Sequence, residues 1–179
     1  MRNDIDQVLI SETDLEKRIS ELGVEITKDY ANKDLLVVGI LKGANIFMSD
    51  LVRQIDQSIM MDFMVVSSYG TEAVSSGVVK IIKDLDFDIE GKDILIVEDI
   101  IDTGLTLSYL KEYLMNRKAA SVKICSLLNK PSRRVNHVTI DYLGFEVPDE
   151  FIIGYGIDYA EHYRNLPFIG TLKRSVYEK

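Results

Sequence analysis

The stretch KDILIVEDIIDTGLTLSYL, residues 92–110, decides the fold of this chain. It begins with a continuous apolar run over residues 94–97, which is typical of a strand buried on both faces of a parallel sheet. Two carboxylates, Glu98 and Asp99, close this run, and Asp102 leads into a short loop that is rich in threonine. A helical apolar repeat follows. The pattern predicts a strand, an acidic and hydroxyl-rich loop, and a helix.

The loop between this strand and helix has the composition of a phosphate site. Open α/β sheets bind ligands where strand ends meet helix N-termini, whose first N–H groups are unpaired. Thr103, Gly104 and Thr106 add hydroxyl donors and close backbone approach. Glu98 and Asp99 repel phosphate, so they predict sugar hydroxyls or a divalent cation as partners. A helix cap with solvated charges is the alternative, but it explains single residues better than this whole cluster.

Composition predicts a soluble globular protein. The chain has 179 residues, of which 46% are hydrophobic and 28% charged, and this suits one domain with its own core. A net charge of −8 argues against binding to nucleic acid through a basic face and against an anionic membrane surface. The polar N-terminus has no signal-peptide core, and Cys125 is the single cysteine and a candidate core thiol. We therefore expect a cytoplasmic protein.

Apolar periodicity predicts strands and helices that alternate along the chain. Helices are expected over residues 11–31 and 44–55, and strands over residues 35–41, 59–67, 78–85, 121–128 and 138–142. The strand at 78–85 is expected to pair with the strand before it, outside the main sheet, and the segment after residue 146 to be less regular. The alternation predicts an α/β fold with a doubly wound, mainly parallel sheet flanked by helices, in a single domain over residues 1–179.

Two lysines follow predicted strands at the same edge of this sheet. Lys42 and Gly43 come directly after the strand at 35–41 and combine a charge with close backbone approach. Lys130 follows the strand at 121–128. An ammonium group has donors only, so Lys130 suits the O6 acceptor of a 6-oxopurine rather than the amino group of adenine. Either lysine alone could be a solvated turn residue.

The segment VEDIIDTGLTL, residues 97–107, resembles the binding motif for phosphoribosyl pyrophosphate (PRPP) in type I phosphoribosyltransferases. Other segments resemble the bacterial hypoxanthine–guanine branch of that family, and together they cover nearly the whole chain. They are LKGA at 41–44, SY at 68–69, NKP at 129–131, EFIIGYGIDY at 150–159 and HYRNL at 162–166. In the family, the first of these carries a non-proline cis peptide bond.

The resemblance implies a role for each matching residue. PRPP and its phosphate would be bound by Glu98, Asp99, Asp102, Thr103, Gly104, Leu105 and Thr106. Pyrophosphate would be bound by Lys42, Gly43 and Arg164, and the purine by Lys130, Phe151, Ile152 and Asp158. Mg²⁺ would be held by Glu98, Asp99 and Asp158. Asp102 would be the catalytic residue, which accepts the N7 proton of the purine. Ser68 and Tyr69 would belong to a lid over about residues 68–79, and a small hood would form from about residues 1–12 and 138–179.

The implied reaction transfers 5-phosphoribose from PRPP to N9 of hypoxanthine or guanine and gives IMP or GMP with pyrophosphate, in a homodimer or homotetramer. Leu105 departs from the pattern, because many relatives carry a basic or polar residue there. Asn129 also departs, because an acidic residue is expected before the lysine. Two alternatives remain. One is the same fold acting on xanthine, adenine or uracil, of which Lys130 and Phe151 disfavour the last two. The other is an RNA-binding regulator, which the net charge of −8 and the intact motifs disfavour.

Overall fold

The computed structural model describes residues 1–68 and 79–177, so the predicted lid residue Tyr69 lies outside the described part. Its helices are α1 (Glu12–Asp29), α2 (Asn45–Val52), α3 (Leu105–Asn116) and α4 (Arg174–Tyr177), and its strands are β1 (Ile5–Ile10), β2 (Leu35–Leu41), β3 (Met60–Ser68), β4 (Val79–Lys83), β5 (Asp93–Ile101), β6 (Ser121–Asn129), β7 (Tyr142–Glu146), β8 (Ile152–Ile153) and β9 (Ile169–Leu172). None of these helices is long and apolar enough to cross a membrane.

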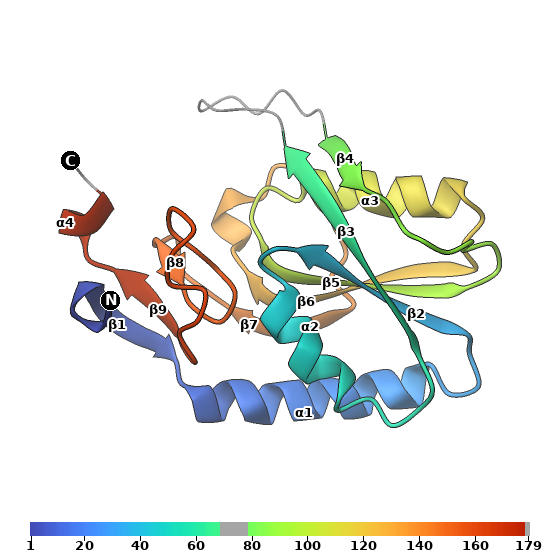
Figure 1. Cartoon of the computed structure of the whole chain (residues 1–179), viewed down its shortest axis with the longest axis horizontal. Coiled ribbons are helices and arrows are strands. Elements are labelled where there is room, and N and C mark those ends of the chain that lie inside the picture. Colours follow the sequence, from blue (N-terminus) through green and yellow to red (C-terminus); the bar gives the residue numbers. More distant parts are fainter. Residues whose placement is uncertain (69–78, 178–179) are drawn as a thin grey trace.

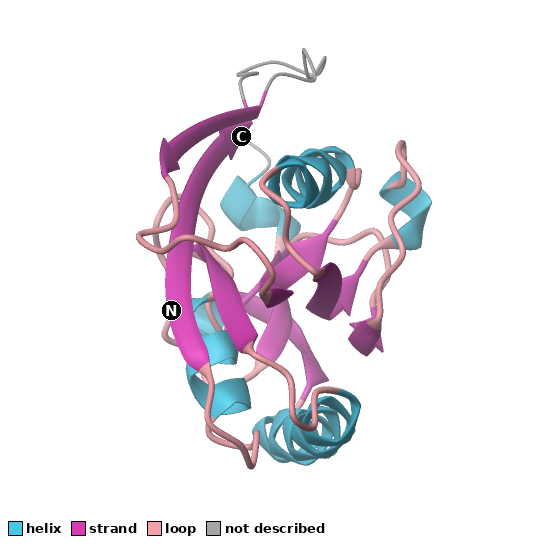
Figure 2. Ribbon diagram, turned by 90° about the vertical axis from the view of Figure 1, so that its right-hand side faces the viewer, coloured by secondary structure: helices cyan, strands magenta, loops and turns pink. Residues whose placement is uncertain are grey.

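A six-stranded sheet with the order β4-β3-β2-β5-β6-β7 forms the centre of the molecule (Figure 1). All its neighbouring strands run parallel except β3 and β4. Successive residues of a strand point to opposite faces. Val37 therefore packs in one core with Leu15 of α1 and Phe47 of α2, while Val38 packs in a second core with Leu110 of α3. Helices thus cover both faces of the sheet, as Figure 2 shows, and the predicted doubly wound fold is confirmed.

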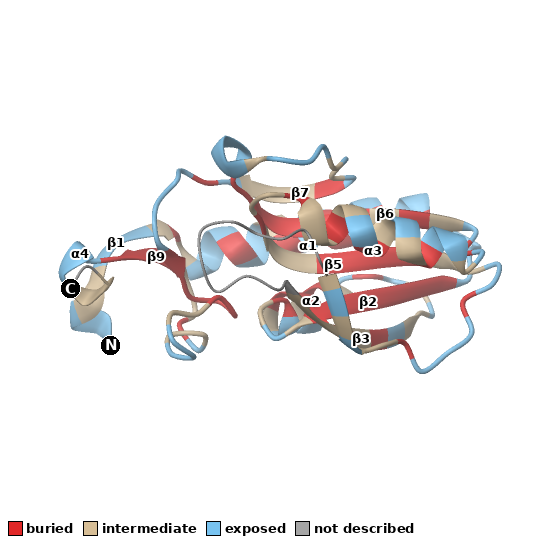
Figure 3. Cartoon of the chain, turned by 90° about the horizontal axis from the view of Figure 1, so that it is seen from above, coloured by how far each residue is buried: buried red, intermediate tan, exposed pale blue. Residues whose placement is uncertain are grey.

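The central strands are buried, whereas the helices expose their outer faces (Figure 3). The β2 run has the predicted bounds, and α1 begins after Ser11, whose hydroxyl accepts a hydrogen bond from the Asp14 N–H at 3.2 Å. Cys125 of β6 has no exposed surface, as expected for a core thiol, and burial raises the pKa of its thiol far above the usual range.

Four sequence predictions need correction. Glu98 and Asp99 do not close the strand β5, which continues to Ile101, because Ile100 and Ile101 still pair with β6. The strand β4 pairs with β3 as expected, but it forms the edge of the main sheet rather than lying outside it. The helix α2 ends at Val52, before a tight turn in which the Gln54 N–H bonds to the Leu51 carbonyl.

The fourth correction concerns the strand predicted over residues 138–142. The strand is β7, which begins only at Tyr142. Val138 and Ile140 instead pack against the core beneath α3, which explains their apolar pattern. Asp141 ends this segment by bonding through its carboxylate and its backbone N–H to the backbone of Ile124, at 2.9 Å each.

The two ends of the chain form a second, three-stranded antiparallel sheet with the order β1-β9-β8. This is the hood expected from the terminal segments, although its strands had not been predicted individually. It is smaller than the predicted hood over residues 1–12 and 138–179, because residues 142–146 form β7 of the main sheet. Figure 1 shows it to the left of the main sheet. Ile10, Ile152 and Ile169 join the same apolar core as α1 and α2. The hood is therefore packed against the main sheet through shared core side chains.

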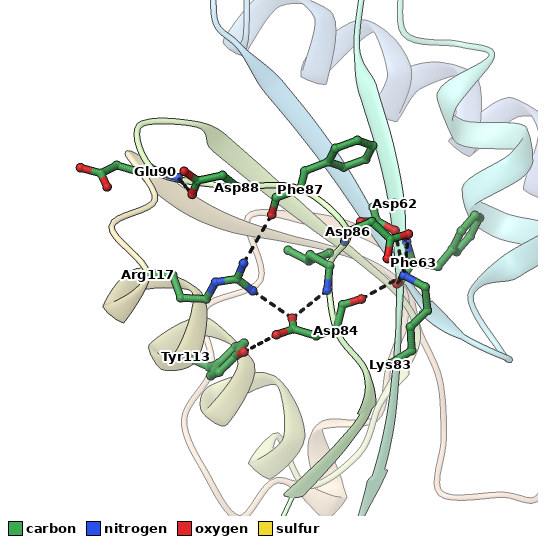
Figure 4. A network of polar contacts seen from close by, with 11 residues as sticks. Asp62, Phe63, Lys83, Asp84, Asp86, Phe87, Asp88, Glu90, Tyr113 and Arg117 are labelled. Carbon is green, nitrogen blue, oxygen red and sulfur yellow. Dashed lines mark hydrogen bonds and ion pairs between the residues drawn. The ribbon is translucent and has the colours of Figure 1, made fainter.

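A polar network fastens β4 and the loop after it to the sheet and to α3 (Figure 4). Lys83 donates to the Asp62 carboxylate at 3.2 Å and to the Phe63 carbonyl at 3.0 Å. Asp84 accepts hydrogen bonds from the Tyr113 hydroxyl and, at 2.9 Å, from Arg117. Because Asp62 is buried and fully engaged, the network holds the base of the β3–β4 hairpin in a fixed position.

Candidate active site

The carboxyl ends of β2, β5 and β6 lie next to one another in the sheet. Gly39 of β2 pairs with Val97 of β5, and Ile101 of β5 pairs with Asn129 of β6. The segments that follow these strands therefore meet at one edge, which is the ligand-binding edge of a parallel sheet. The expectation that Lys42, the acidic loop and Lys130 share this edge is confirmed.

The loop after β5 is built around Gly104. Its φ of +81° is the left-handed conformation that glycine adopts without strain, and α3 begins directly after it. The Thr103 carbonyl accepts hydrogen bonds from the N–H groups of Val135 and Asn136, at 3.0 and 2.9 Å. The N-cap residue is Gly104 and Asp102 makes no cap hydrogen bond, whereas the Thr103 hydroxyl accepts a long hydrogen bond from the Leu105 N–H at 3.4 Å. The N–H groups that follow Leu105 in the first turn of α3 are left available for an anion.

Asp102 lies beside the buried lysine of the next strand. Its Oδ1 atom is buried and, among the described residues, has no hydrogen-bond partner. The nearest cation is the Lys130 ammonium, at 3.9 Å. Lys130 is only 7% exposed and is held by the Glu150 carbonyl at 3.0 Å and by the Asp149 carboxylate at 3.8 Å. The Lys130 ammonium, a donor held in place, therefore lies next to the Asp102 Oδ1 atom, an acceptor that has no hydrogen-bond partner among the described residues.

Glu98 and Asp99 project from the last part of β5. Desolvation and the neighbouring charge of Asp99 raise the pKa of Glu98 well above its usual range. Two crowded carboxylates are hard oxygen donors whose repulsion a divalent cation would relieve, so the pair fits Mg²⁺. Asp158 is engaged elsewhere, and the described residues contain no group of three metal-ligating side chains. A cation here would therefore complete its coordination with water or a phosphorylated ligand.

The loop after β2 approaches Asp99 closely. The peptide bond between Leu41 and Lys42 is cis, as in the family that the sequence resembles. A methyl group added to Gly43 would overlap the Asp99 carboxylate, and one added to Gly156 would overlap the Gly43 carbonyl. The predicted close backbone approach at Gly43 is thus present. It packs this loop between β5 and the loop that follows β8.

Lys42 and Arg164, which are far apart in the sequence, meet at a shared carboxylate. Glu161 binds Lys42 at 2.9 Å and Arg164 at 3.4 Å. Arg164 also pairs with Asp158 at 2.9 Å and donates to the Gly156 carbonyl at 2.8 Å. Glu161 was not identified from the sequence. It occupies a position between two cations that a polyanionic ligand could take instead.

A cavity of about 760 Å³ lies between the main sheet and the hood. Its walls contain the residues that were assigned to base recognition, together with the assigned catalytic residue: Asp102, Lys130, Phe151, Ile152 and Asp158. Phe151 exposes 37% of its surface there. Tyr177 of α4 stacks on its ring with centroids 4.9 Å apart, and Tyr159 meets its edge at 5.1 Å. The cavity therefore combines an aromatic wall with one buried cation and one unpaired carboxylate oxygen.

Comparison with known proteins identifies the family. The model of the phosphoribosyl transferase domain matches residues 9–160. The chain belongs to this phosphoribosyltransferase family. It is 60% identical over 178 residues to the hypoxanthine-guanine phosphoribosyltransferase of Bacillus subtilis strain 168, with 99% of each chain covered.

Solved structures of other members have the same fold. A hypoxanthine phosphoribosyltransferase from Staphylococcus aureus superimposes with a TM-score of 0.97 at 52% identity, covering 100% of this chain and 97% of that one. The hypoxanthine phosphoribosyl transferase of Trypanosoma cruzi gives a TM-score of 0.91 at 38% identity, covering 97% of this chain and 94% of that one. That structure concerns the role of the C-terminal region in oligomeric state and enzymatic activity.

Several residues of this phosphoribosyltransferase line the cavity without having been identified from the sequence. They are Asp6, Arg133, Asp149, Lys173, Arg174 and Tyr177. Most come from the two ends of the chain, where apolar periodicity gave no signal. The pairing of Arg133 with Asp149, at 2.8 Å, joins two exposed segments that only the fold brings together. The sequence offered one sign of these polar residues, the two adjacent acidic residues at 149–150 that follow Pro148.

Proposed function

We propose that this phosphoribosyltransferase transfers 5-phosphoribose from PRPP to N9 of hypoxanthine or guanine and releases pyrophosphate, with Mg²⁺ as cofactor. The observation that carries the proposal is the pair formed by Lys130 and Asp102, 3.9 Å apart in the cavity. A 6-oxopurine presents an acceptor at O6 and, in the N7–H form, a donor next to it. The pair offers the matching donor and acceptor, and Phe151 offers a ring for stacking.

The other site residues fit PRPP. The loop over residues 102–106 would hold the 5′-phosphate on its N–H groups and hydroxyls. Lys42 and Arg164 would leave Glu161 and bind the pyrophosphate. Glu98 and Asp99 would hold the ribose hydroxyls and, through Mg²⁺, the pyrophosphate, and Asp158 would hold a second ion. When bound, the metal neutralises the charge that grows on the departing group.

In this proposal the chain itself positions the base and moves one proton. Lys130 is fixed before the substrate arrives, so it can donate to O6 with little loss of side-chain freedom. Asp102 accepts the N7 proton, which raises the electron density at N9 as it attacks the anomeric carbon. As pyrophosphate leaves, the anomeric carbon passes through an oxocarbenium-like state, and the cavity walls would shield this state from water.

The test is steady-state turnover of the wild-type chain with PRPP and Mg²⁺, comparing hypoxanthine, guanine, xanthine and adenine. We expect turnover with hypoxanthine and guanine and at least 100-fold lower kcat/KM with adenine, because its amino group faces the Lys130 donor. Chelation of the metal with EDTA should abolish turnover. Equal rates with adenine would contradict the assigned role of Lys130. Absence of turnover with every base, together with RNA binding that weakens with salt, would favour the regulator instead.

We also propose that the protein is a cytoplasmic homo-oligomer, a dimer or a tetramer. Exposed apolar side chains such as Val24, Ile82 and Val135 would lose water contact in such an assembly. Light scattering during size-exclusion chromatography should give at least twice the chain mass of 20.3 kDa. A single-chain mass at micromolar concentration would reject this assembly.

A further inference from the structure

The phosphate loop over residues 102–106 contains no cation of its own. Its side chains are one carboxylate, two threonines, a glycine and a leucine. A phosphate monoester carries about −1.5 to −2 charges at neutral pH. The N-terminus of α3 offers only about half a positive charge in return. An additional positive charge close to this loop would therefore matter for phosphate binding.

Arg134 lies directly against the loop. A methyl group placed on Gly104 would be 3.2 Å from the NH1 nitrogen of Arg134 and 3.2 Å from its Cδ. The two residues after Arg134 donate their N–H groups to the Thr103 carbonyl, at 3.0 and 2.9 Å. The side chain of Arg134 and the backbone of the two residues after it therefore both contact the loop.

The charge of Arg134 is not matched by a carboxylate. Its NH2 nitrogen donates to the side-chain oxygen of Asn129, a neutral amide. Its NH1 nitrogen is buried and has no hydrogen-bond partner among the described residues, none of which forms an ion pair with this guanidinium. The next residue along the chain differs sharply, because Arg133 is exposed and pairs with Asp149 at 2.8 Å. Arg134 is half-buried, and partly removing a charge from water without a counter-charge costs free energy, so an anion beside it would be stabilising; the described residues supply none.

We infer that Arg134 is the counter-charge of the phosphate bound at residues 102–106. It lies against Gly104 and acts as a residue that strengthens and positions phosphate binding. Because its NH1 nitrogen is buried and the side chain is half-buried, the attraction is screened less than that of an exposed charge. This inference rests on the proposed function and names the source of charge for that site.

The test compares the binding of IMP with the binding of inosine, which lacks the phosphate, by calorimetry. Arg134→Met keeps an unbranched apolar stem and removes the charge. We expect it to weaken IMP binding about 10- to 100-fold and to change inosine binding less than about threefold. Arg53→Met is the matched control, because it removes the same charge from an exposed side chain on the far end of α2 and should change neither ligand.

A second variant keeps the Arg134 side chain and changes its neighbour instead. Asn129→Asp sets a carboxylate beside the guanidinium and should also weaken IMP binding selectively. Because the Asn129 amide also donates to the Glu146 carboxylate at 3.4 Å, the melting temperature of the ligand-free variant is compared with that of the wild type to detect a folding defect. This variant decides the question if Arg134→Met does not fold. Equal losses for IMP and inosine, or no loss for IMP, would overturn the inference. A wild type that does not prefer IMP to inosine would instead contradict the proposed function.

Discussion

Replacing Asp102 with Asn is expected to lower kcat with hypoxanthine by about 10²- to 10⁴-fold and to leave IMP affinity within about threefold. The amide has nearly the same shape and can still meet the purine edge, but it cannot accept the N7 proton. The structure makes this residue the best-placed base, because its Oδ1 atom is buried, unpaired among the described residues and 3.9 Å from Lys130.

The measurement is a pair of values, kcat from steady-state turnover and the IMP dissociation constant from calorimetry. Asp149→Asn is the matched control, since it removes a carboxylate at a similar distance, 3.8 Å, from the same lysine. Its carboxylate lies outside the predicted proton path, so its loss of kcat should stay below about tenfold. Equal losses in the two variants, or equal losses of kcat and of IMP affinity in Asp102→Asn, would contradict the assignment of Asp102 as base.

The second large effect is expected for Lys130→Met. We expect kcat/KM for hypoxanthine to fall about 100- to 1,000-fold, which corresponds to about 3 to 4 kcal/mol of transition-state stabilisation. Lys130 is buried and already held by the Glu150 carbonyl at 3.0 Å, so its donor is preorganised for O6. Its removal leaves the O6 acceptor unpaired in the cavity, together with the Asp102 carboxylate, whereas Asp149 keeps its ion pair with Arg133.

Discrimination between bases separates this role from a structural one. The ratio of kcat/KM for hypoxanthine to that for adenine should fall in Lys130→Met, whereas a packing defect would lower both values alike. Lys173→Met provides the control, because Lys173 is exposed at the rim of the same cavity. If both variants keep the wild-type ratio, Lys130 does not read O6.

The sequence predicted the main sheet well because its central strands are continuous apolar runs. Residues 35–41 can be buried on both faces only in a parallel sheet with helices on each side, and β2 has these bounds. The hood was harder to resolve into strands. The strand β8 has only two residues, and β1 pairs with β9 across more than 150 positions of sequence, so neither carries a periodic signal of its own.

The candidate site, like the fold, could be predicted only in part. Lys42, Asp102 and Lys130 follow strands whose order the pattern implied, so their meeting at one edge could be predicted. Glu161 could not be placed, because its position depends on a chain path with unusual backbone angles. Ala160, Glu161 and Tyr163 all have positive φ values between 50° and 72°, although none is glycine. No local residue preference predicts such a path, and it is this path that brings Glu161 between two distant cations.

The complete burial of Cys125 gives the protein a built-in reporter. A thiol-specific dye reacts with the thiolate, and both inaccessibility and a raised pKa keep this thiol silent in the native fold. Because the chain contains no other cysteine, dye uptake counts only molecules that have opened around β6. Labelling rates under native conditions would thus measure the opening free energy of the central sheet without denaturant. A cysteine introduced at the rim of the cavity would carry a single, site-specific probe in the otherwise unmodified protein.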